Sequence, residues 1–167
     1  MSRTELPHTR GCIVCGHDNH QGLHLHLHVD EQAGMVTADY VPRPEHIGFE
    51  GIVHGGILST VLDEAMVWCA TWAGKRFCVA GELNVRFRQS VSVGQNLTVE
   101  ARVASIRSRL IETEGSIRDE SGKVLVEANG KYVPVPPPRN REVVATLVAE
   151  PATARTLDAL KHAAGAV

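Results

Sequence analysis

The sequence has 167 residues, of which 43% are hydrophobic, and this predicts one domain of ordinary size with a core of its own. Its formal net charge of -2 and its pI near 6.5 argue against a nucleic-acid-binding or membrane-surface protein, which needs a clustered basic excess. No apolar run reaches the roughly 18 residues of a membrane span. The polar start lacks the apolar core of a signal peptide, so we expect a cytoplasmic location by default.

Residues 1–22 are interpreted as an N-terminal extension. Residues 1–10 are polar and are expected to be loosely held. A Cys12-Ile-Val-Cys15 segment follows, among Gly, Asn and Asp residues that are typical of turns. Disulfides are not expected in a cytosolic chain. Cys69 and Cys78 have apolar neighbours, which predicts that they are core residues.

Two strands are predicted before the first helix. Residues 23–29, Leu-His-Leu-His-Leu-His-Val, alternate strictly, which is typical of a strand with one buried face. Its other face would carry His24, His26 and His28. A hairpin-like connection then leads to a second strand at Met35–Val41.

The next segment is a loop followed by a long helix. Prolines and glycines in residues 42–51 predict irregular structure, which ends at His54-Gly55-Gly56. A helix is predicted from about Ile57 to Ala73 and closed by Gly74. Apolar residues cover most of its circumference, so we expect it to be enclosed. Its one polar stripe consists of Ser59, Thr60, Asp63 and Glu64.

Four further strands are predicted, at residues 77–88, 97–106, 110–118 and 123–133. Their hairpin-length links make them antiparallel neighbours. The simplest α+β fold for this order is one curved antiparallel sheet wrapped around one long central helix. The proline-rich stretch 134–138 would end a domain at residues 1–138. The tail at residues 139–167 is expected to be helical, most clearly around Leu157–Leu160.

Four segments resemble the hotdog-fold acyl-CoA thioesterases of the phenylacetate-pathway (PaaI-like) branch, over about residues 11–136. They are Cys12-x-x-Cys15-Gly-x-x-Asn19-x-x-Gly22-Leu23-x-Leu25, His54-Gly-Gly with Leu62-Asp63-Glu64-Ala65-Met66, Glu82-Leu-Asn-Val-Arg-Phe-Arg88, and Asp119-Glu-Ser-Gly-Lys-Val-Leu-Val-Glu-Ala128. The resemblance implies a hotdog fold, a homodimer or homotetramer, and active sites at the dimer interface. It implies an acyl-CoA or aryl-CoA substrate and no cofactor.

Two positions differ from the pattern of these enzymes. Where relatives often carry Gln or Asn before the His-Gly-Gly turn, this chain has His46-Ile-Gly-Phe49, so only His46 could hold the thioester carbonyl there. Where relatives often carry Ser or Thr at the start of the strand after the helix, this chain has Ala80.

Thioester hydrolysis needs a base or a carboxylate nucleophile, together with donors for the oxygen that becomes negative. Asp63 is the candidate for the first role. The amide of Gly56, with help from Gly55, is the candidate for the second. His54 is a candidate catalytic residue, with a ring that bonds the local backbone as the alternative. His46 and Glu64 are candidates for orienting water or substrate.

Metal binding is the less favoured interpretation of the cysteine and histidine motifs in the N-terminal segment. Cys12 and Cys15 could bind zinc with His17 and His20, but the spacing between the pairs is far shorter than in zinc fingers. We therefore predict no metal site there, and none for the histidines at positions 24, 26 and 28. Arginines that could meet the phosphates of coenzyme A are Arg86, Arg88, Arg107 and Arg109.

Two other functions stay open. A hydratase or dehydratase acting on enoyl- or hydroxyacyl-CoA would use an Asp and a His, for which Asp39 and His46 are available. A non-catalytic acyl-CoA-binding protein would keep the fold but lose the carboxylate, whereas Asp63 is present.

Overall fold

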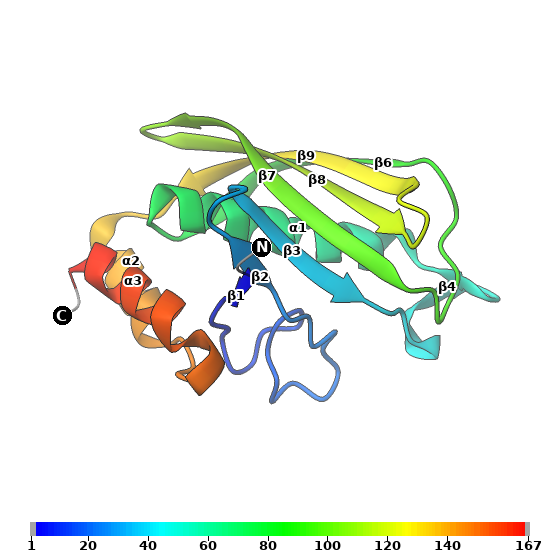
Figure 1. Cartoon of the computed structure of the whole chain (residues 1–167), viewed down its shortest axis with the longest axis horizontal. Coiled ribbons are helices and arrows are strands. Elements are labelled where there is room, and N and C mark those ends of the chain that lie inside the picture. Colours follow the sequence, from blue (N-terminus) through cyan, green and yellow to red (C-terminus); the bar gives the residue numbers. More distant parts are fainter. Residues whose placement is uncertain (1–2, 166–167) are drawn as a thin grey trace.

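The computed structural model describes residues 3–165, in which a seven-stranded sheet curves around one long helix (Figure 1). The strand order is β1-β2-β3-β7-β8-β9-β6, and all neighbours are antiparallel. The strands are β1 (Arg3–Glu5), β2 (His28–Asp30), β3 (Met35–Tyr40), β6 (Cys78–Phe87), β7 (Leu97–Arg107), β8 (Leu110–Asp119) and β9 (Val124–Pro134). The predicted α+β fold and the antiparallel order of its last four strands are therefore confirmed.

A small hairpin leads the chain into the central helix. After the 3-10 turn η1 (Pro44–His46), β4 (Ile47–Phe49) pairs with β5 (Ile52–Val53), and α1 (Gly55–Gly74) begins two residues later. The helix starts slightly earlier than predicted. The left-handed residue that ends it is Lys75, with φ of 51°, rather than the predicted Gly74.

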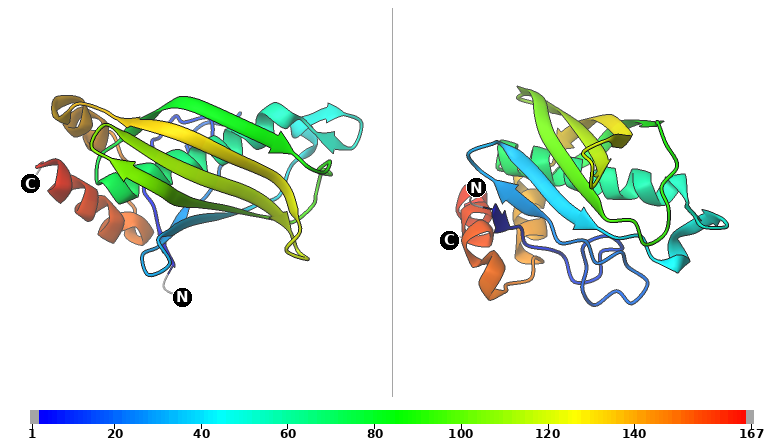
Figure 2. Two further views of the ribbon diagram at one scale, coloured as in Figure 1. Left: turned by 90° about the horizontal axis from the view of Figure 1, so that it is seen from above. Right: turned by 45° about the vertical axis from the view of Figure 1, so that its right-hand side comes forward.

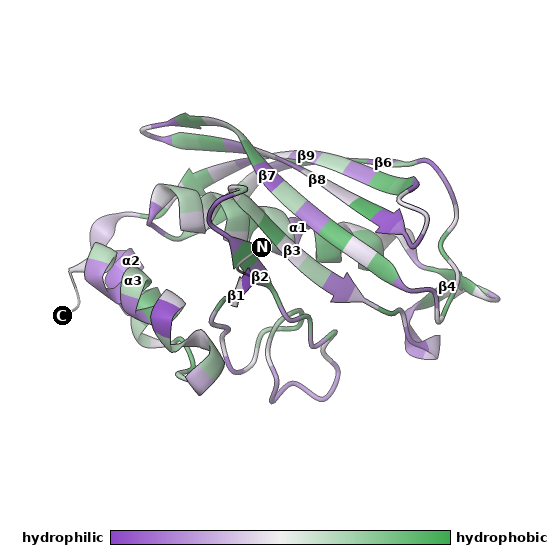
Figure 3. Ribbon diagram, in the orientation of Figure 1, coloured by the Kyte–Doolittle hydropathy of each residue, from purple (hydrophilic) through white to green (hydrophobic). Residues whose placement is uncertain are grey.

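Helix α1 crosses one face of the sheet and is apolar along most of its length (Figure 2; Figure 3). Its side chains at Val61, Leu62, Ala65 and Met66 have no exposed surface. The sheet makes room for them with small residues: a Cβ added at Gly115 of β8 would lie 2.9 Å from Met66 Sδ. Within residues 3–165, no helix combines the length and hydropathy that a membrane span requires.

The N-terminal segment is more ordered than the sequence predicted. The prediction of a strand over residues 23–29 was wrong for most of that range, because β2 begins only at His28. His24 has a positive φ of 53°, which interrupts extended structure. Burial still alternates, since Leu25 and Leu27 are each 3% exposed. Their backbones bond the segment before them: Leu25 N donates to Val14 O, and Leu6 N donates to Leu27 O.

Residues 3–10 were expected to be loosely held, and this expectation was also wrong for the described residues. Arg3–Glu5 form the edge strand β1, and Leu6 is 3% exposed. The helices α2 (Pro137–Ala145) and α3 (Ala154–Ala164), separated by the 3-10 turn η2 (Pro151–Thr153), pack beside this segment (Figure 1). Thr156 Oγ1 donates a hydrogen bond of 2.6 Å to Glu5 O, while Leu157 and Leu160 join the main core.

Candidate active site

The start of α1 is the turn His54-Gly55-Gly56, whose amides differ in their hydrogen bonding. His54 is the N-cap, and its ring Nδ1 accepts the amide hydrogen of Gly56 at 2.8 Å. For the Gly55 amide, no acceptor is present among residues 3–165. An unpaired amide at a helix start is a donor for a negatively charged oxygen. The geometry therefore favours the Gly55 amide, and Gly56 becomes a donor only when the His54 ring turns away.

A groove of about 400 Å³ opens beside this turn. It lies between the helix start, the β4–β5 hairpin and the end of β6. Its walls carry exposed aromatic side chains, since Phe49 is 78% exposed and Phe87 is 51% exposed. A Cβ added at Gly55 would lie 3.1 Å from the Phe87 ring, so the glycine keeps the helix start open to this groove.

Asp63 lies on the side of α1 that faces β9. The hydroxyl of Tyr132, a fully buried residue, donates a hydrogen bond of 2.9 Å to Asp63 Oδ1. Burial raises the pKa of Asp63, and the hydrogen bond from Tyr132 lowers it in part. Because α1 is unbroken, the eight residues from Gly55 to Asp63 correspond to about 12 Å along the helix axis. One carbonyl group cannot touch both sites within a single chain.

Glu64 is the next residue but faces a different part of the molecule. Trp68 Nε1 donates to Glu64 Oε1 at 3.1 Å, and Cys12 Sγ lies 3.8 Å from the same oxygen. Burial, with the charge of Cys12 as a smaller contribution, raises the pKa of Glu64 to about 7. The structure brings Glu64 to the N-terminal segment and away from the groove.

His46 is 5% exposed and holds the loop before the helix. Its Nδ1 accepts the amide hydrogen of Arg43 at 3.1 Å and lies 2.9 Å from the Tyr40 hydroxyl. Burial and the nearby Arg43 lower the pKa of His46. Its backbone carbonyl accepts the amide hydrogen of His54 at 2.8 Å. The structure therefore does not bring the His46 ring into the groove, and His46 instead positions the backbone of the helix cap.

The four arginines considered for coenzyme A are spread along the sheet. Arg88 lines the groove, and its Nη2 forms a 2.6 Å ion pair with Glu127. Arg107 and Arg109 lie at the hairpin between β7 and β8. This hairpin is at the opposite end of the sheet from Arg88, because Ile111, at the start of β8, pairs with Tyr132 near the end of β9. Of the four, Arg88 has the placement that suits a ligand at the helix start.

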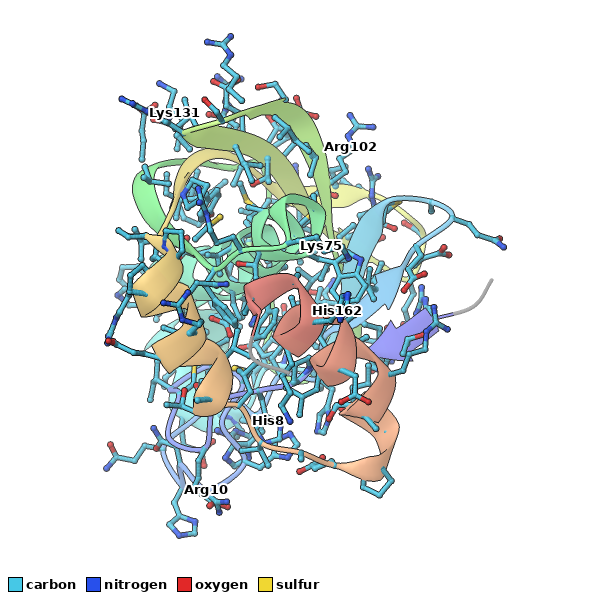
Figure 4. All side chains as sticks on the ribbon, turned by 90° about the vertical axis from the view of Figure 1, so that its left-hand side faces the viewer. His8, Arg10, Lys75, Arg102, Lys131 and His162 are labelled. Atoms are coloured by element: carbon cyan, nitrogen blue, oxygen red, sulfur yellow. The ribbon has the colours of Figure 1, made fainter. Side chains whose placement is uncertain are left out.

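The histidines of the N-terminal segment form a cluster that the sequence did not reveal. The rings of His8 and His17 lie 3.8 Å apart, and His26 is 4.6 Å from His17. Glu150, just before η2, lies 3.4 Å from His17 Nδ1 and 3.8 Å from His8 Nε2. Figure 4 shows His8 between the C-terminal helices and the N-terminal segment. His17 is thus drawn away from the cysteines, and the exposed His20 does not join them.

Tyr132 is the residue that sequence reasoning missed beside Asp63. Strand β9 alternates, with Val126, Ala128, Gly130 and Tyr132 facing the helix. A buried tyrosine hydroxyl needs a polar partner, and the one polar stripe predicted on α1 offered a carboxylate. The alternation of β9, combined with the polar stripe predicted on α1, could have indicated that Tyr132 and Asp63 form a pair.

Comparison with known proteins places the site region in a family. Residues 50–126 match the family model described as thioesterase superfamily. A protein of Archaeoglobus fulgidus, named a candidate esterase, is 21% identical over 102 residues, which are 61% of this chain and 66% of that protein. The chain thus spans slightly less than two thirds of this curated relative.

Solved structures agree with this assignment. The thioesterase superfamily protein RHA08564 is similar with a TM-score of 0.68 at 27% identity, over 74% of this chain and 60% of that chain. The Escherichia coli PaaI protein of the phenylacetic acid degradation operon has a TM-score of 0.63 at 19% identity, over 68% of this chain and 81% of that chain. A Streptococcus mutans protein, smu.793, solved with bound acetyl-CoA, has a TM-score of 0.58 at 14% identity, over 61% of this chain and 82% of that chain.

Residues 50–126, which include Gly55 and Asp63, therefore match the thioesterase superfamily, and the fold is the hotdog fold. The resemblance that the sequence motifs indicated is confirmed.

Proposed function

We propose that this protein is an acyl-CoA thioesterase, which hydrolyses a thioester of coenzyme A to a free acid and CoA. The observation that carries the proposal is Asp63, a carboxylate held inside an apolar helix–sheet interface by one hydrogen bond from Tyr132. It lies on the helix whose glycine turn opens onto an apolar groove. The acetyl-CoA bound to the Streptococcus mutans protein supports a CoA ester as the substrate class.

The working unit in this proposal is a homodimer. Strand β6 is a sheet edge of ten residues, and Val79 on it is 54% exposed. Long edge strands with exposed apolar side chains favour pairing with another chain. Antiparallel pairing of two β6 edges runs the two α1 helices in opposite directions. The start of one helix then lies beside later turns of the other, which overcomes the separation of about 12 Å within one chain.

The proposed reaction uses both chains at each site. The Gly55 amide of one chain donates to the thioester carbonyl oxygen as it becomes negative. Asp63 of the partner subunit takes a proton from the attacking water, or attacks the carbonyl itself and is released by water. The C–S bond then breaks and the CoA thiolate leaves with a proton. The acyl group would occupy the groove beside Phe49 and Phe87, with Arg88 near the CoA phosphates.

The hydratase alternative finds less support. Asp39 and Tyr40 are consecutive strand residues and face opposite sides of the sheet. His46 contacts Tyr40 on the buried side, whereas Asp39 is exposed, so the two side chains do not meet. A non-catalytic acyl-CoA-binding role remains an outcome of the experiment below.

The test is an activity panel combined with subunit mixing. A panel of acyl- and aryl-CoA esters is incubated with the protein, and a thiol reagent follows free CoA. We expect CoA release with at least one ester. Binding of esters without cleavage would instead support the sensor role. Hydration of an enoyl-CoA, seen as loss of its conjugated absorbance, would support the hydratase.

Subunit mixing then tests the shared site. Asp63→Asn and Gly55→Val are each expected to be inactive, while Asp39→Asn serves as an active control. After the two inactive proteins are unfolded together and refolded, random pairing gives heterodimers with one intact site. Activity should return to about a quarter of wild type. No recovery, with heterodimers present by native mass spectrometry, would contradict a site built from two chains.

A further inference from the structure

The N-terminal segment contacts α1 through two thiols and a carboxylate. Cys12 Sγ, Cys15 Sγ and a carboxylate oxygen of Glu64 all lie within 4.8 Å of one another. The separation of Cys12 Sγ and Glu64 Oε1 is 3.8 Å. Two such atoms bound to one tetrahedral zinc ion would be about 3.5 Å apart, given its usual bond lengths. The three donors therefore need only a small movement to share one ion.

The turn that carries the cysteines is shaped to stabilise a thiolate. Val14 N donates to Cys12 Sγ at 3.4 Å, and Gly16 N closes the turn on Cys12 O at 3.0 Å. A Cβ at Gly16 would lie 2.5 Å from Cys12 N, so this tight turn requires glycine. A thiolate is the form of cysteine that binds metals.

The charge around these donors is not balanced by the protein. Among residues 3–165, no Lys or Arg side chain forms an ion pair with Glu64. Its hydrogen-bond donors are Trp68 and the thiols. Buried acidic groups without a counter-charge are destabilising unless they keep their protons or bind a cation.

We propose that Cys12, Cys15 and Glu64 bind one divalent cation of the zinc class, with water in the fourth position. Two thiolates and one carboxylate match the ligand preference of zinc rather than that of calcium or magnesium. The ion would pin the N-terminal segment to α1 at the residue next to Asp63. This site differs from the metal reading of the sequence, because Glu64 replaces His17 and His20 as the partner of the cysteines. The inference does not depend on the proposed thioesterase activity.

The site can be tested by metal binding to the full chain. The reduced protein is stripped with a chelator and then titrated with Zn²⁺ or Co²⁺. We expect one equivalent per chain, and with Co²⁺ the thiolate-to-metal charge-transfer band and the strong visible bands of tetrahedral cobalt. Cys12→Ser and Cys15→Ser should lower the affinity at least about 100-fold, and Glu64→Gln about 10- to 100-fold. Cys78→Ser, which removes another buried thiol, should keep one equivalent.

Glu64→Gln keeps the test decisive if a cysteine variant does not fold, because the amide has nearly the same shape as the carboxylate. Circular dichroism should show that it is folded. The proposal is overturned if wild type binds no more zinc than Cys12→Ser. It is equally overturned if the metal-free protein as purified contains a Cys12–Cys15 disulfide that excludes the ion, which would make the pair a redox couple.

Discussion

Asp63 and Glu64 are consecutive carboxylates on α1, yet they lie in two different regions of the molecule. Asp63 faces the sheet, where Tyr132 is its hydrogen-bond donor. Glu64 faces the N-terminal segment, where Trp68 and Cys12 contact it. Consecutive helix residues point about 100° apart, so a single step along the chain moves a carboxylate from one environment to the other.

The contrast shows how similar residues acquire different roles. On the sheet side, a carboxylate with one hydrogen bond stays free to act on a substrate or on water. On the N-terminal side, Glu64 is enclosed by a segment that closes over the helix, and burial raises its pKa to about 7. We therefore assign chemistry to the sheet side of α1 and anchoring to the N-terminal side. Each prediction below tests this division.

The largest effect is expected from replacing the two carboxylates in turn. Asp63→Asn removes the proposed base or nucleophile and should lower kcat about 10²- to 10⁴-fold. Glu64→Gln should lower kcat less than about 10-fold, because its side chain contacts Trp68 and Cys12 and not the sheet side, where Tyr132 bonds Asp63. Steady-state kinetics on the best CoA ester measure both. Equal losses in the two variants would contradict the division, provided that both melt at similar temperatures.

The second largest effect on activity is expected from removing the hydrogen-bond donor to Asp63. Tyr132→Phe removes a hydroxyl that bonds Asp63 at 2.9 Å. A hydrogen bond to a charged group is worth about 1.5–3 kcal/mol, so kcat should fall about 10- to 100-fold with KM nearly unchanged. The chain has one other tyrosine, Tyr40, which provides a matched control.

Tyr40→Phe also removes a buried hydroxyl, which lies 2.9 Å from His46 Nδ1. It should lower the free energy of unfolding by about 1 kcal/mol but leave kcat within about 2-fold of wild type. If the two tyrosine variants lost activity equally, Tyr132 would be a structural residue and would not position Asp63.

Much of the sheet side could be predicted from the sequence. The alternating patterns of strands β7 to β9 largely match which of their residues are buried. Helix α1 is apolar around most of its circumference, as expected of an enclosed helix. Asp63 stood out because it interrupts an apolar helix. The sequence analysis named the amide of Gly56 as the donor, with help from Gly55. The sequence does not show that the His54 ring accepts the Gly56 amide hydrogen, because this depends on where the ring points.

The N-terminal side was harder to predict for a physical reason. Leu25 and Leu27 alternate as in a strand, but their backbones bond residues 6 and 14 instead of a sheet neighbour. Period-two burial reports which side chains are enclosed and not which backbone they pair with. The contact of Cys12 with Glu64 joins residues that are 52 positions apart, and no local pattern encodes such a contact.

The smallest effect is a pH dependence of stability on the N-terminal side. Burial, followed by the charge of His17, lowers the pKa of His8 below its usual 6.5, and His26 acts in the same direction. Glu150 and Glu5 oppose this shift. Above pH 6.5, His8 is neutral in both the folded and the unfolded state. As the pH falls below 6.5, the unfolded state takes up the proton first, so stability decreases until the folded-state pKa is reached.

Replacing His8 by Gln should therefore flatten the decline of the unfolding free energy between about pH 7 and pH 5. Urea unfolding across this range measures it. His20→Gln, which alters an exposed ring, is the control and should keep the wild-type slope. His8 packs against His17 beside the C-terminal helices. In the wild-type protein, the loss of stability at low pH should therefore appear first as increased hydrogen exchange in residues 5–27 and 147–157. If exchange rose first in β8 and β9, the acid-sensitive region would be the sheet side, and the assignment of anchoring to the N-terminal side would be wrong.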